Sequence, residues 1–309
     1  MIVLPSGGIL HPIRHLEAEM HRTPREIQMT ARRVERLRKT GGAHKYDYGH
    51  ALVLTGGTGA TGAARLAARG ALRIGAGLVT LGVPPAAQLE VAMHSTAVML
   101  MRVPDAGALR DALADDRITA LCLGPGMGVA RAADLLGAAL APPGRGTLLD
   151  ADALTALAGD ANLMGRLHER CVLTPHEGEF ACLFPDLAAA FQKRPGDLAT
   201  RIGAVSDAAM RTGATVLLKG ADTVVAAPYG QISLHAAKTD RSAPWLATAG
   251  SGDVLAGFIT GLLARGHPPL LACETAIWLH AEAANHHGPG LIAEDLPEAL
   301  PQVFAAIGV

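Results

Sequence analysis

Short apolar runs alternate with longer Ala-, Leu- and Arg-rich stretches of helical spacing from about residue 44 to the C-terminus. Most of the apolar runs are continuous, which is typical of strands in a parallel sheet covered on both faces. Eight runs are predicted to be strands: Ala51–Leu54, Leu78–Val83, Ala120–Leu123, Thr147–Leu149, Val172–Thr174, Thr215–Leu218, Val224–Ala227 and Gln231–Leu234. The turn Pro228-Tyr229-Gly230 joins the last two runs and predicts an edge hairpin.

The stretches between and after these runs are predicted to be helices: Ala60–Gly75, Pro84–Met93, Ala106–Ala114, Arg131–Ala139, Ala153–Ala158, Pro195–Thr212, Asp253–Ala264, Leu270–His286 and Asp295–Ile307. Regular alternation of strands and helices predicts an α/β fold, a three-layer αβα sandwich with a mostly parallel central sheet. Residues 44–309 are expected to form this domain, and residues 1–43 an N-terminal extension. In the extension, Thr23 followed by Glu26 has the spacing of a capping box and predicts a helix start, followed by a basic, solvated helix and a hinge at Gly41-Gly42.

The composition argues against several classes of function. Half of the 309 residues are hydrophobic but only 3% are aromatic, so Ala, Leu, Val and Ile must build the core. The net charge of −1 gives no reason to expect a nucleic-acid or membrane partner. The four cysteines are scattered without a CxxC pair, and no apolar run reaches membrane-spanning length. We therefore expect free thiols and a cytoplasmic protein.

Small and polar residues follow five of the predicted strands. In a parallel sheet ligands bind at the carboxyl ends of the strands, so these segments are expected to share one site. They are Thr55–Gly59, Gly124–Gly128, Asp150–Ala153, Pro175–Glu179 and Lys219–Thr223. A sixth segment, Gly250-Ser251-Gly252-Asp253, immediately precedes an apolar helix.

The sixth segment suits a phosphate. A loop of small residues that enters a helix leaves backbone N–H groups pointing at one spot. Asp253 beside that spot could act as a base or hold a metal. A glycine-rich turn with an ordinary first-turn aspartate fits the same pattern.

The other segments offer ligand contacts and simpler alternatives. Asp150 could bind a substrate or a hydrated Mg²⁺, whereas Asp152 is predicted to be the N-cap of the next helix. His176 is placed to touch a ligand, and Glu179 could bind Mg²⁺ through water. Lys219 suits a phosphate, with a solvated strand-end lysine as the alternative.

Several familiar motifs are absent. Gly57, Gly59 and Gly62 have GxGxxG spacing, but this is only a weak match to a dinucleotide fingerprint, and the chain has no GxxxxGK(S/T) loop and no GxSxG elbow. The Gly124-Pro125-Gly126 segment either leaves room for a flat ligand or makes a tight turn. His176 and its neighbours do not form HExxH, which argues against zinc.

Taken together, the segments resemble the ADP/ATP-dependent NAD(P)H-hydrate dehydratases, a branch of the ribokinase-like fold. The matching pieces run in the family's order: His44–His50, Ala76–Val79, Leu123–Gly126, Leu149–Ala153, Leu173–Glu179, Leu218–Gly220 with Thr223, Ala247–Leu255 and Leu279-His280. The TPHxGE string at Thr174–Glu179 is specific, whereas many sugar and vitamin kinases share the GSGD loop.

The resemblance implies a metabolite-repair reaction in which water is removed from hydrated NADH or NADPH with ADP or ATP as phosphate donor and Mg²⁺ bridging the phosphates. Asp253 would deprotonate the ring hydroxyl, and the backbone of residues 250–252 would stabilise the phosphate charge. The resemblance places the nucleotide against Lys219, Gly220, Ala221, Asp222, Thr223, Gly250, Ser251 and Gly252. It places the hydrated cofactor against Gly62, Ala63, Gly126, Asp150, His176 and Asp253, and it implies a homo-oligomer, a tetramer.

Two departures from the family stand out. The Asn-x-x-Gly that many members carry before the GSGD loop has no counterpart in residues 234–245. The family is often fused behind an epimerase domain, for which residues 1–43 are too short, so we expect the chain to act on one epimer. A ribokinase-like small-molecule kinase and a nucleotide-sensing module without activity are the competing hypotheses. The Thr174–Glu179 and His44–His50 segments favour the dehydratase.

Overall fold

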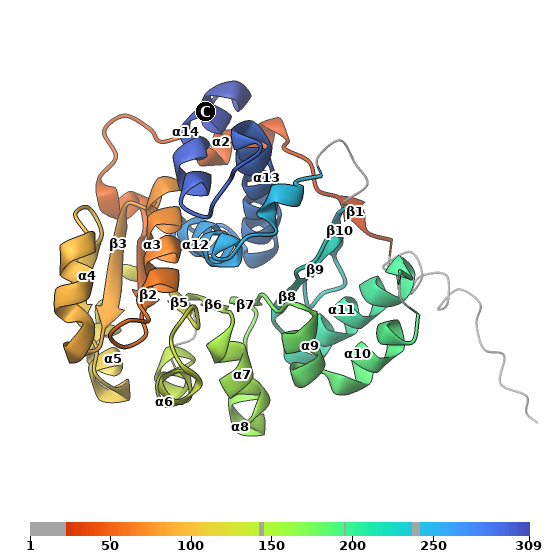
Figure 1. Ribbon diagram of the computed structural model, residues 1–309, viewed down its shortest axis with the longest axis horizontal. Coiled ribbons are helices and arrows are strands. Elements are labelled where there is room, and N and C mark those ends of the chain that lie inside the picture. Colours follow the sequence, from red (N-terminus) through yellow and green to blue (C-terminus); the bar gives the residue numbers. More distant parts are fainter. Residues whose placement is uncertain (1–22, 142–144, 195, 237–241) are drawn as a thin grey trace, which may run out of the picture.

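The computed structural model describes residues 23–141, 145–194, 196–236 and 242–309 (Figure 1). Among them a ten-stranded sheet has the order β1-β10-β9-β8-β7-β6-β5-β2-β3-β4. Its strands are β1 Arg25–Glu26, β2 His50–Leu54, β3 Leu78–Val83, β4 Met99–Arg102, β5 Ile118–Leu123, β6 Gly146–Leu149, β7 Cys171–Leu173, β8 Thr215–Leu218, β9 Thr223–Ala226 and β10 Ile232–His235. Strand β9 runs antiparallel to both of its neighbours, and the other pairs are parallel.

Helices cover both faces of the sheet, as the three-layer prediction requires. Figure 1 shows α3, α12, α13 and α14 over one face and α6, α7 and α9–α11 over the other. The helices are α2 Ala31–Leu37, α3 Gly62–Arg73, α4 Gln88–His94, α5 Ala106–Ala112, α6 Val129–Ala139, α7 Asp152–Ala158, α8 Ala161–Met164, α9 Glu177–Leu183, α10 Pro185–Gln192, α11 Leu198–Thr212, α12 Ser251–Ala264, α13 Pro269–His287 and α14 Asp295–Ile307, with short 3₁₀ turns at Lys45–Tyr48, Pro85–Ala87 and Pro244–Leu246.

Alternate residues of each central strand enter two separate cores. Ala51 and Val53 of β2 pack with the cluster under α3, α12 and α13. Leu52 and Leu54 of the same strand pack with the cluster under α6, α7 and α11. Successive side chains of a strand point to opposite faces, so a sheet covered on both sides needs a continuous apolar strand.

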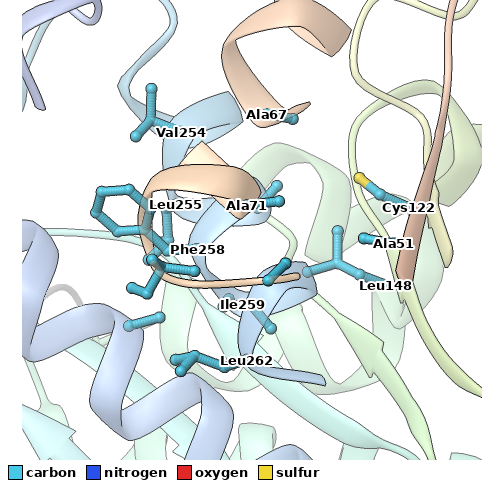
Figure 2. Close-up of a cluster of buried hydrophobic side chains, with 14 of the residues drawn as sticks. Ala51, Ala67, Ala71, Cys122, Leu148, Val254, Leu255, Phe258, Ile259 and Leu262 are labelled. Atoms are coloured by element: carbon cyan, nitrogen blue, oxygen red, sulfur yellow. The ribbon is translucent and has the colours of Figure 1, made fainter. Parts of the chain in front are cut away.

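Helix α12 lies deep in the first core and packs closely on α3 (Figure 2). Small residues make the close approach possible. A Cβ added at Gly257 would lie 2.1 Å from the carbonyl oxygen of Ala67, and one at Gly261 would lie 2.6 Å from that of Ala71. The contact fixes the N-termini of α3 and α12 relative to each other, which matters because both begin at the predicted site.

The predicted helix start at Thr23 is wrong. Residues 25 and 26 are extended as β1 and pair with β10, and α2 begins only at Ala31. The N–H of Ile27 donates to the carbonyl oxygen of Leu234 at 2.9 Å, and the Ile27 side chain is 2% exposed. Burial of Ile27 and pairing with the sheet edge override the local capping signal. The division at residue 43 stays a prediction, and Leu37 of the extension is also buried in the core.

Other predicted elements need smaller corrections. Strand β4 and helices α8–α10 were not predicted. The stretch predicted as one helix from Pro84 divides into a 3₁₀ turn and α4. Helix α11 begins at Leu198, where the side chain of Asp197 accepts from the N–H groups of residues 199 and 200. Residue 195, the predicted start, lies outside the described residues.

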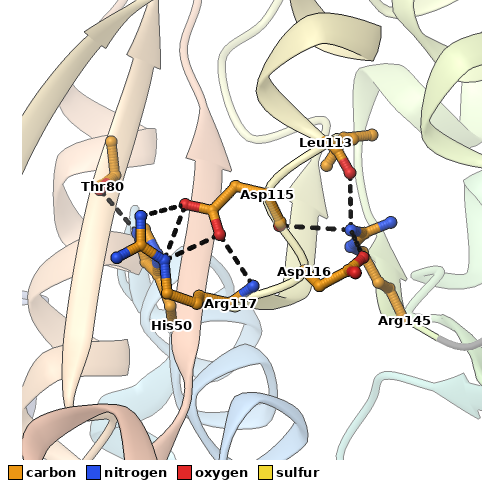
Figure 3. A network of polar contacts seen from close by, with 7 residues as sticks. All are labelled: His50, Thr80, Leu113, Asp115, Asp116, Arg117 and Arg145. Carbon is orange, nitrogen blue, oxygen red and sulfur yellow. Dashed lines mark hydrogen bonds and ion pairs between the residues drawn. The ribbon is translucent and has the colours of Figure 1, made fainter.

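A polar network ties together the amino ends of the strands, at the edge opposite the predicted site (Figure 3). His50 and Thr80 join β2 to β3 through a 2.8 Å hydrogen bond. Arg145 donates to the carbonyl oxygen of Leu113 at 2.6 Å. No described helix is long and apolar enough to span a bilayer.

Candidate active site

The GSGD loop enters α12 through a left-handed residue. Gly250 has φ 87°, and a Cβ there would lie 2.8 Å from both Ala293 and Leu66, so glycine is required on two grounds. Among the described residues, the N–H groups of Gly252 and Asp253 have no backbone partner, because the first turn of a helix offers none. The loop therefore presents two free donors at the positive end of α12, as an anion site needs.

The loop is held from behind by two hydrogen bonds. The hydroxyl of Ser251 donates to the carbonyl oxygen of Leu246 at 2.7 Å. The Nε2 of His280, on α13, lies 2.9 Å from the carbonyl oxygen of Ser251. Burial lowers the pKa of His280 to about 4, so the ring is neutral at pH 7 and its proton lies on Nε2. In the sequence His280 stood out only as part of a family match, and the structure shows that it holds the GSGD loop.

Three charged groups from three elements meet beside the loop. Lys219 Nζ lies 2.7 Å from Asp150 Oδ1, and the two side chains are 21% and 3% exposed. A Cβ added at Gly252 would lie 3.7 Å from the same Nζ. Burial raises the pKa of Asp253 to about 6; the charge of Asp150 adds to the rise, and that of Lys219 opposes it. Asp253 is thus a partly desolvated carboxylate, ionised at neutral pH and more basic than an ordinary aspartate, as a general base requires.

Glycine loops close the other side of the site. A Cβ at Gly126 would lie 3.1 Å from the Cβ of Ala63, which brings two predicted substrate contacts together. A Cβ at Gly124 would lie 1.6 Å from the carbonyl oxygen of Asp150. These glycines allow the loops to approach one another, and Gly62 remains exposed at the start of α3.

The loop after β6 has an unusual backbone. Ala151 has φ 46°, the one non-glycine residue with positive φ in the described chain. Such conformations cost about 1–3 kcal/mol and cluster at functional sites. The predicted N-cap role of Asp152 is wrong: Asp152 is the first residue of α7, and its Oδ2 accepts from the N–H of Gly128 at 2.8 Å. Asp152 therefore joins two site loops.

His176 and Glu179 hold each other at the start of α9. His176 Nδ1 accepts from the N–H groups of Gly178 and Glu179 at 3.0 and 3.1 Å. Glu179 Oε2 accepts from the N–H of His176 at 2.8 Å, which completes a capping box. The His176 side chain stays 59% exposed, with its Nε2 3.4 Å from Glu179 Oε1, whereas the side chain of Glu179 is 13% exposed. The three-residue spacing of His and Glu was the sequence signal for this cap.

The segment predicted to bind the nucleotide is anchored to the TPHxGE string. The N–H of Lys219 donates to the carbonyl oxygen of Pro175 at 2.8 Å, and the hydroxyl of Thr223 donates to that of Gly220 at 2.9 Å. Arg201, which the sequence did not single out, donates to the carbonyl oxygen of Lys219 at 3.0 Å and pairs with Glu177. Ala221 and Asp222 line a neighbouring cavity of about 430 Å³.

Solved structures with the same architecture define the class of protein. A ribokinase-like superfamily protein from Enterococcus faecalis matches with a TM-score of 0.74 at 21% identity, over 90% of this chain and 95% of that one. This likeness shows a ribokinase-like fold and confirms the predicted architecture. The ADP/ATP-dependent NAD(P)H-hydrate dehydratase of Bacillus subtilis, co-crystallised with ATP and Mg²⁺, matches with a TM-score of 0.69 at 25% identity, over 94% and 96%.

Sequence relatives place the chain more closely. A family model described as NAD(P)H-hydrate dehydratase matches residues 51–302. The ADP-dependent (S)-NAD(P)H-hydrate dehydratase of Neisseria meningitidis is 34% identical over 89% of each chain. The bifunctional NAD(P)H-hydrate repair enzyme of Moorella thermoacetica is 39% identical over 94% of this chain, which spans 55% of that protein's length. The chain belongs to the NAD(P)H-hydrate dehydratase family.

Proposed function

We propose that this chain removes water from hydrated NADH or NADPH and uses ADP as the phosphate donor. The observation that carries the proposal is the environment of Asp253, a carboxylate of raised pKa beside two free N–H donors and the Lys219 ammonium. The family match and the name of the Neisseria meningitidis relative support the substrate and the donor. Because the chain spans about half of its bifunctional relatives, the proposal concerns the dehydration alone.

The proposed reaction has two steps. Asp253 takes the proton of the ring hydroxyl, and the hydroxyl oxygen attacks the terminal phosphorus of ADP, so the P–O bond to AMP breaks. The N–H groups of Gly252 and Asp253 and the Lys219 ammonium stabilise the charge that grows on the transferred phosphate. The C–O bond of the phosphorylated hydrate then breaks, and phosphate leaves with the bonding electrons. Loss of a ring proton restores the dihydronicotinamide.

The residues fit an Mg²⁺ ion that the nucleotide itself brings. Among the described residues no three His, Cys, Asp or Glu side chains form a metal cluster. Mg²⁺ commonly binds substrate phosphates and water with one or two carboxylates, and the site offers Asp150 and Glu179 for that role. The ion would neutralise phosphate charge. That Glu179 takes part stays a prediction, because its carboxylate already serves the α9 cap.

Two further expectations, on cellular location and oligomeric state, also stay proposals. We expect a reducing, cytoplasmic location because Cys122, Cys171 and Cys273 are buried free thiols. We also expect a homotetramer, which light scattering of the purified chain tests directly.

Turnover separates the proposal from its rivals. The chain is incubated with ADP or ATP and hydrated NADH or NADPH, and the recovery of dihydronicotinamide absorbance is followed. We expect recovery that depends on the nucleotide and falls about 10³-fold in Asp253→Asn. Phosphorylation of a small-molecule alcohol without any recovery would identify a kinase instead, and nucleotide binding without either reaction would identify a sensor.

A further inference from the structure

A second cavity lies along α3, away from the nucleotide segment. Its volume is about 810 Å³, in the range of pockets that bind whole small-molecule ligands. Helix α3 forms one wall, residues 94–98 form another, and Phe304 and Val309 close it from α14 and the C-terminus. We name this cavity the α3 groove.

The α3 groove starts at the proposed substrate site. Gly62, the first residue of α3, lines one end, and the next residue, Ala63, lies against Gly126. The other end is lined by Gly75, just beyond the C-terminus of the helix. Twelve helical residues rise about 18 Å, so the groove leads about that far from the reacting ring. A dinucleotide that places its nicotinamide at Asp253 must lay its other half along some surface of this length.

The lining is basic on a nearly neutral chain. Lys39, Arg65, Arg69, Arg73 and Arg265 line the α3 groove, and Glu294 is the one acidic side chain in its lining. The chain as a whole carries a net charge of −1. Leu72 and Phe304 add apolar surface beside the cations. A positive, partly apolar channel is complementary to a ligand that joins phosphates to flat rings.

Most of these cations are already held by ion pairs or hydrogen bonds, and Arg65 is held by neither. Arg69 and Arg73 both contact Glu298, at 2.8 and 2.5 Å. Arg265 donates to the last carbonyl groups of α2 and to Ile74. Within the described chain, Arg65 makes no ion pair and no side-chain hydrogen bond, although it is half-buried.

Glu90 interacts with Arg65 through its charge, but its carboxylate is held by other hydrogen bonds. Glu90 accepts hydrogen bonds from the N–H of Gly59 at 2.7 Å and from the hydroxyl of Thr61. These bonds keep Glu90 on the loop before α3. Arg65, one turn from Gly62, is therefore a half-desolvated cation available to an anion at the entrance of the groove.

We infer that the α3 groove holds the adenosine half of the hydrated dinucleotide and that Arg65 binds its pyrophosphate. The inference rests on the proposed function, because it takes the dinucleotide as substrate. It separates the two nucleotides in space: the phosphate donor lies toward Lys219–Thr223, and the dinucleotide runs from Asp253 along α3. Since the pyrophosphate is common to both substrates, Arg65 serves hydrated NADH and hydrated NADPH alike.

The kinetic test compares Arg65→Gln with Arg110→Gln. Arg110 is exposed on α5, outside the groove, and its variant removes the same charge. We expect Arg65→Gln to raise the KM for both hydrates about tenfold, with kcat and the KM for ADP unchanged, since a hydrogen-bonded charge pair contributes about this much. Arg110→Gln should behave like wild type. A KM for the hydrates within twofold of wild type in Arg65→Gln, or a change confined to the KM for ADP, would overturn the inference.

A binding test keeps the inference independent of turnover. Calorimetry with NADP⁺, which the enzyme cannot dehydrate, measures dinucleotide affinity in wild type, Arg65→Gln and Thr96→Trp. Thr96 is exposed and lines the α3 groove, so a tryptophan there fills it. We expect both variants to weaken NADP⁺ binding about tenfold.

The outcomes distinguish failure of the proposed function from failure of the α3 groove as a dinucleotide site. Weakened NADP⁺ binding without turnover in wild type would reject the proposed function and keep the groove as a dinucleotide site. Normal turnover and normal NADP⁺ binding in both variants would reject the groove. If Thr96→Trp changes only the oligomeric state in light scattering, the groove is a subunit contact and the inference is wrong.

Discussion

Asp253, the proposed base, should cost the protein stability. Burial and the charge of Asp150 raise the pKa of Asp253 from 3.8 to about 6 in the folded chain. A tenfold change in an acid dissociation constant corresponds to about 1.4 kcal/mol, so ionising Asp253 costs the folded state about 3 kcal/mol before screening. Asp253 is half-buried and keeps some solvent contact, which reduces the expected cost to about 1–3 kcal/mol. Asparagine has nearly the same shape and no charge.

The size of the effect depends on pH. A raised folded-state pKa means that the protonated acid is favoured by folding. The cost is absent below the unfolded value of 3.8, grows as the pH rises toward about 6, and is complete above that value. Asp253→Asn should therefore be about 1–3 kcal/mol more stable than wild type at pH 7.5 and show a smaller gain at pH 4.5, although its turnover is about 10³-fold slower.

Urea unfolding followed by circular dichroism at the two pH values measures this difference. Asp111→Asn is the matched control, because Asp111 is an exposed aspartate on α5 outside the site, and it should change stability little at either pH. If Asp253→Asn is no more stable than wild type at pH 7.5, or gains equally at both values, the desolvated carboxylate is not what the structure describes.

Three further predictions concern the site and its support. The value of kcat/KM should rise with pH and level off above about 6 as Asp253 ionises. Lys219→Met should move that rise to higher pH, because the charge of Lys219 opposes the increase in the Asp253 pKa. The pH–rate profiles of both proteins test this. His280→Ala should lower kcat about tenfold, because the GSGD loop loses its hydrogen bond to the imidazole, while ADP binding persists. Steady-state kinetics with an ADP titration measure both. Gly257→Ala should destabilise the fold by about 1–3 kcal/mol or more, because its Cβ would lie 2.1 Å from a backbone oxygen. Gly137→Ala in α6 has room for the Cβ and should stabilise the fold by about 0.5–1 kcal/mol, and thermal melts of the two variants measure both effects.

Much of the fold could be predicted because the strands that matter are buried on both faces. All eight predicted strands exist with small shifts of their ends, and most are continuous apolar runs because helices cover both faces of the sheet. Strand β4 escaped because it lies at the sheet edge with mostly exposed side chains, so no burial pattern marks it. The Thr23 capping signal gave a wrong prediction because Arg25 and Glu26 pair with β10, which lies more than 200 residues away in the sequence.

The candidate site, like the fold, could be predicted only in part. Its segments could be located from topology alone, because parallel strands bring their carboxyl ends to one edge. The ion pair of Lys219 with Asp150 could not, since the two residues are 69 positions apart and nothing local links them. Arg201 was missed because its contacts are with a carbonyl oxygen and with Glu177, both set by how α11 packs.

The central claim is that phosphate is transferred from ADP to the ring hydroxyl and then eliminated. Phosphorus NMR of the complete reaction, with recovered NADH measured by absorbance in the same sample, tests it most directly. We predict equal amounts of NADH, AMP and inorganic phosphate from wild type, formed about 10³-fold more slowly by Asp253→Asn. A phosphorylated product that persists, or NADH formed without cleavage of ADP, would contradict the account.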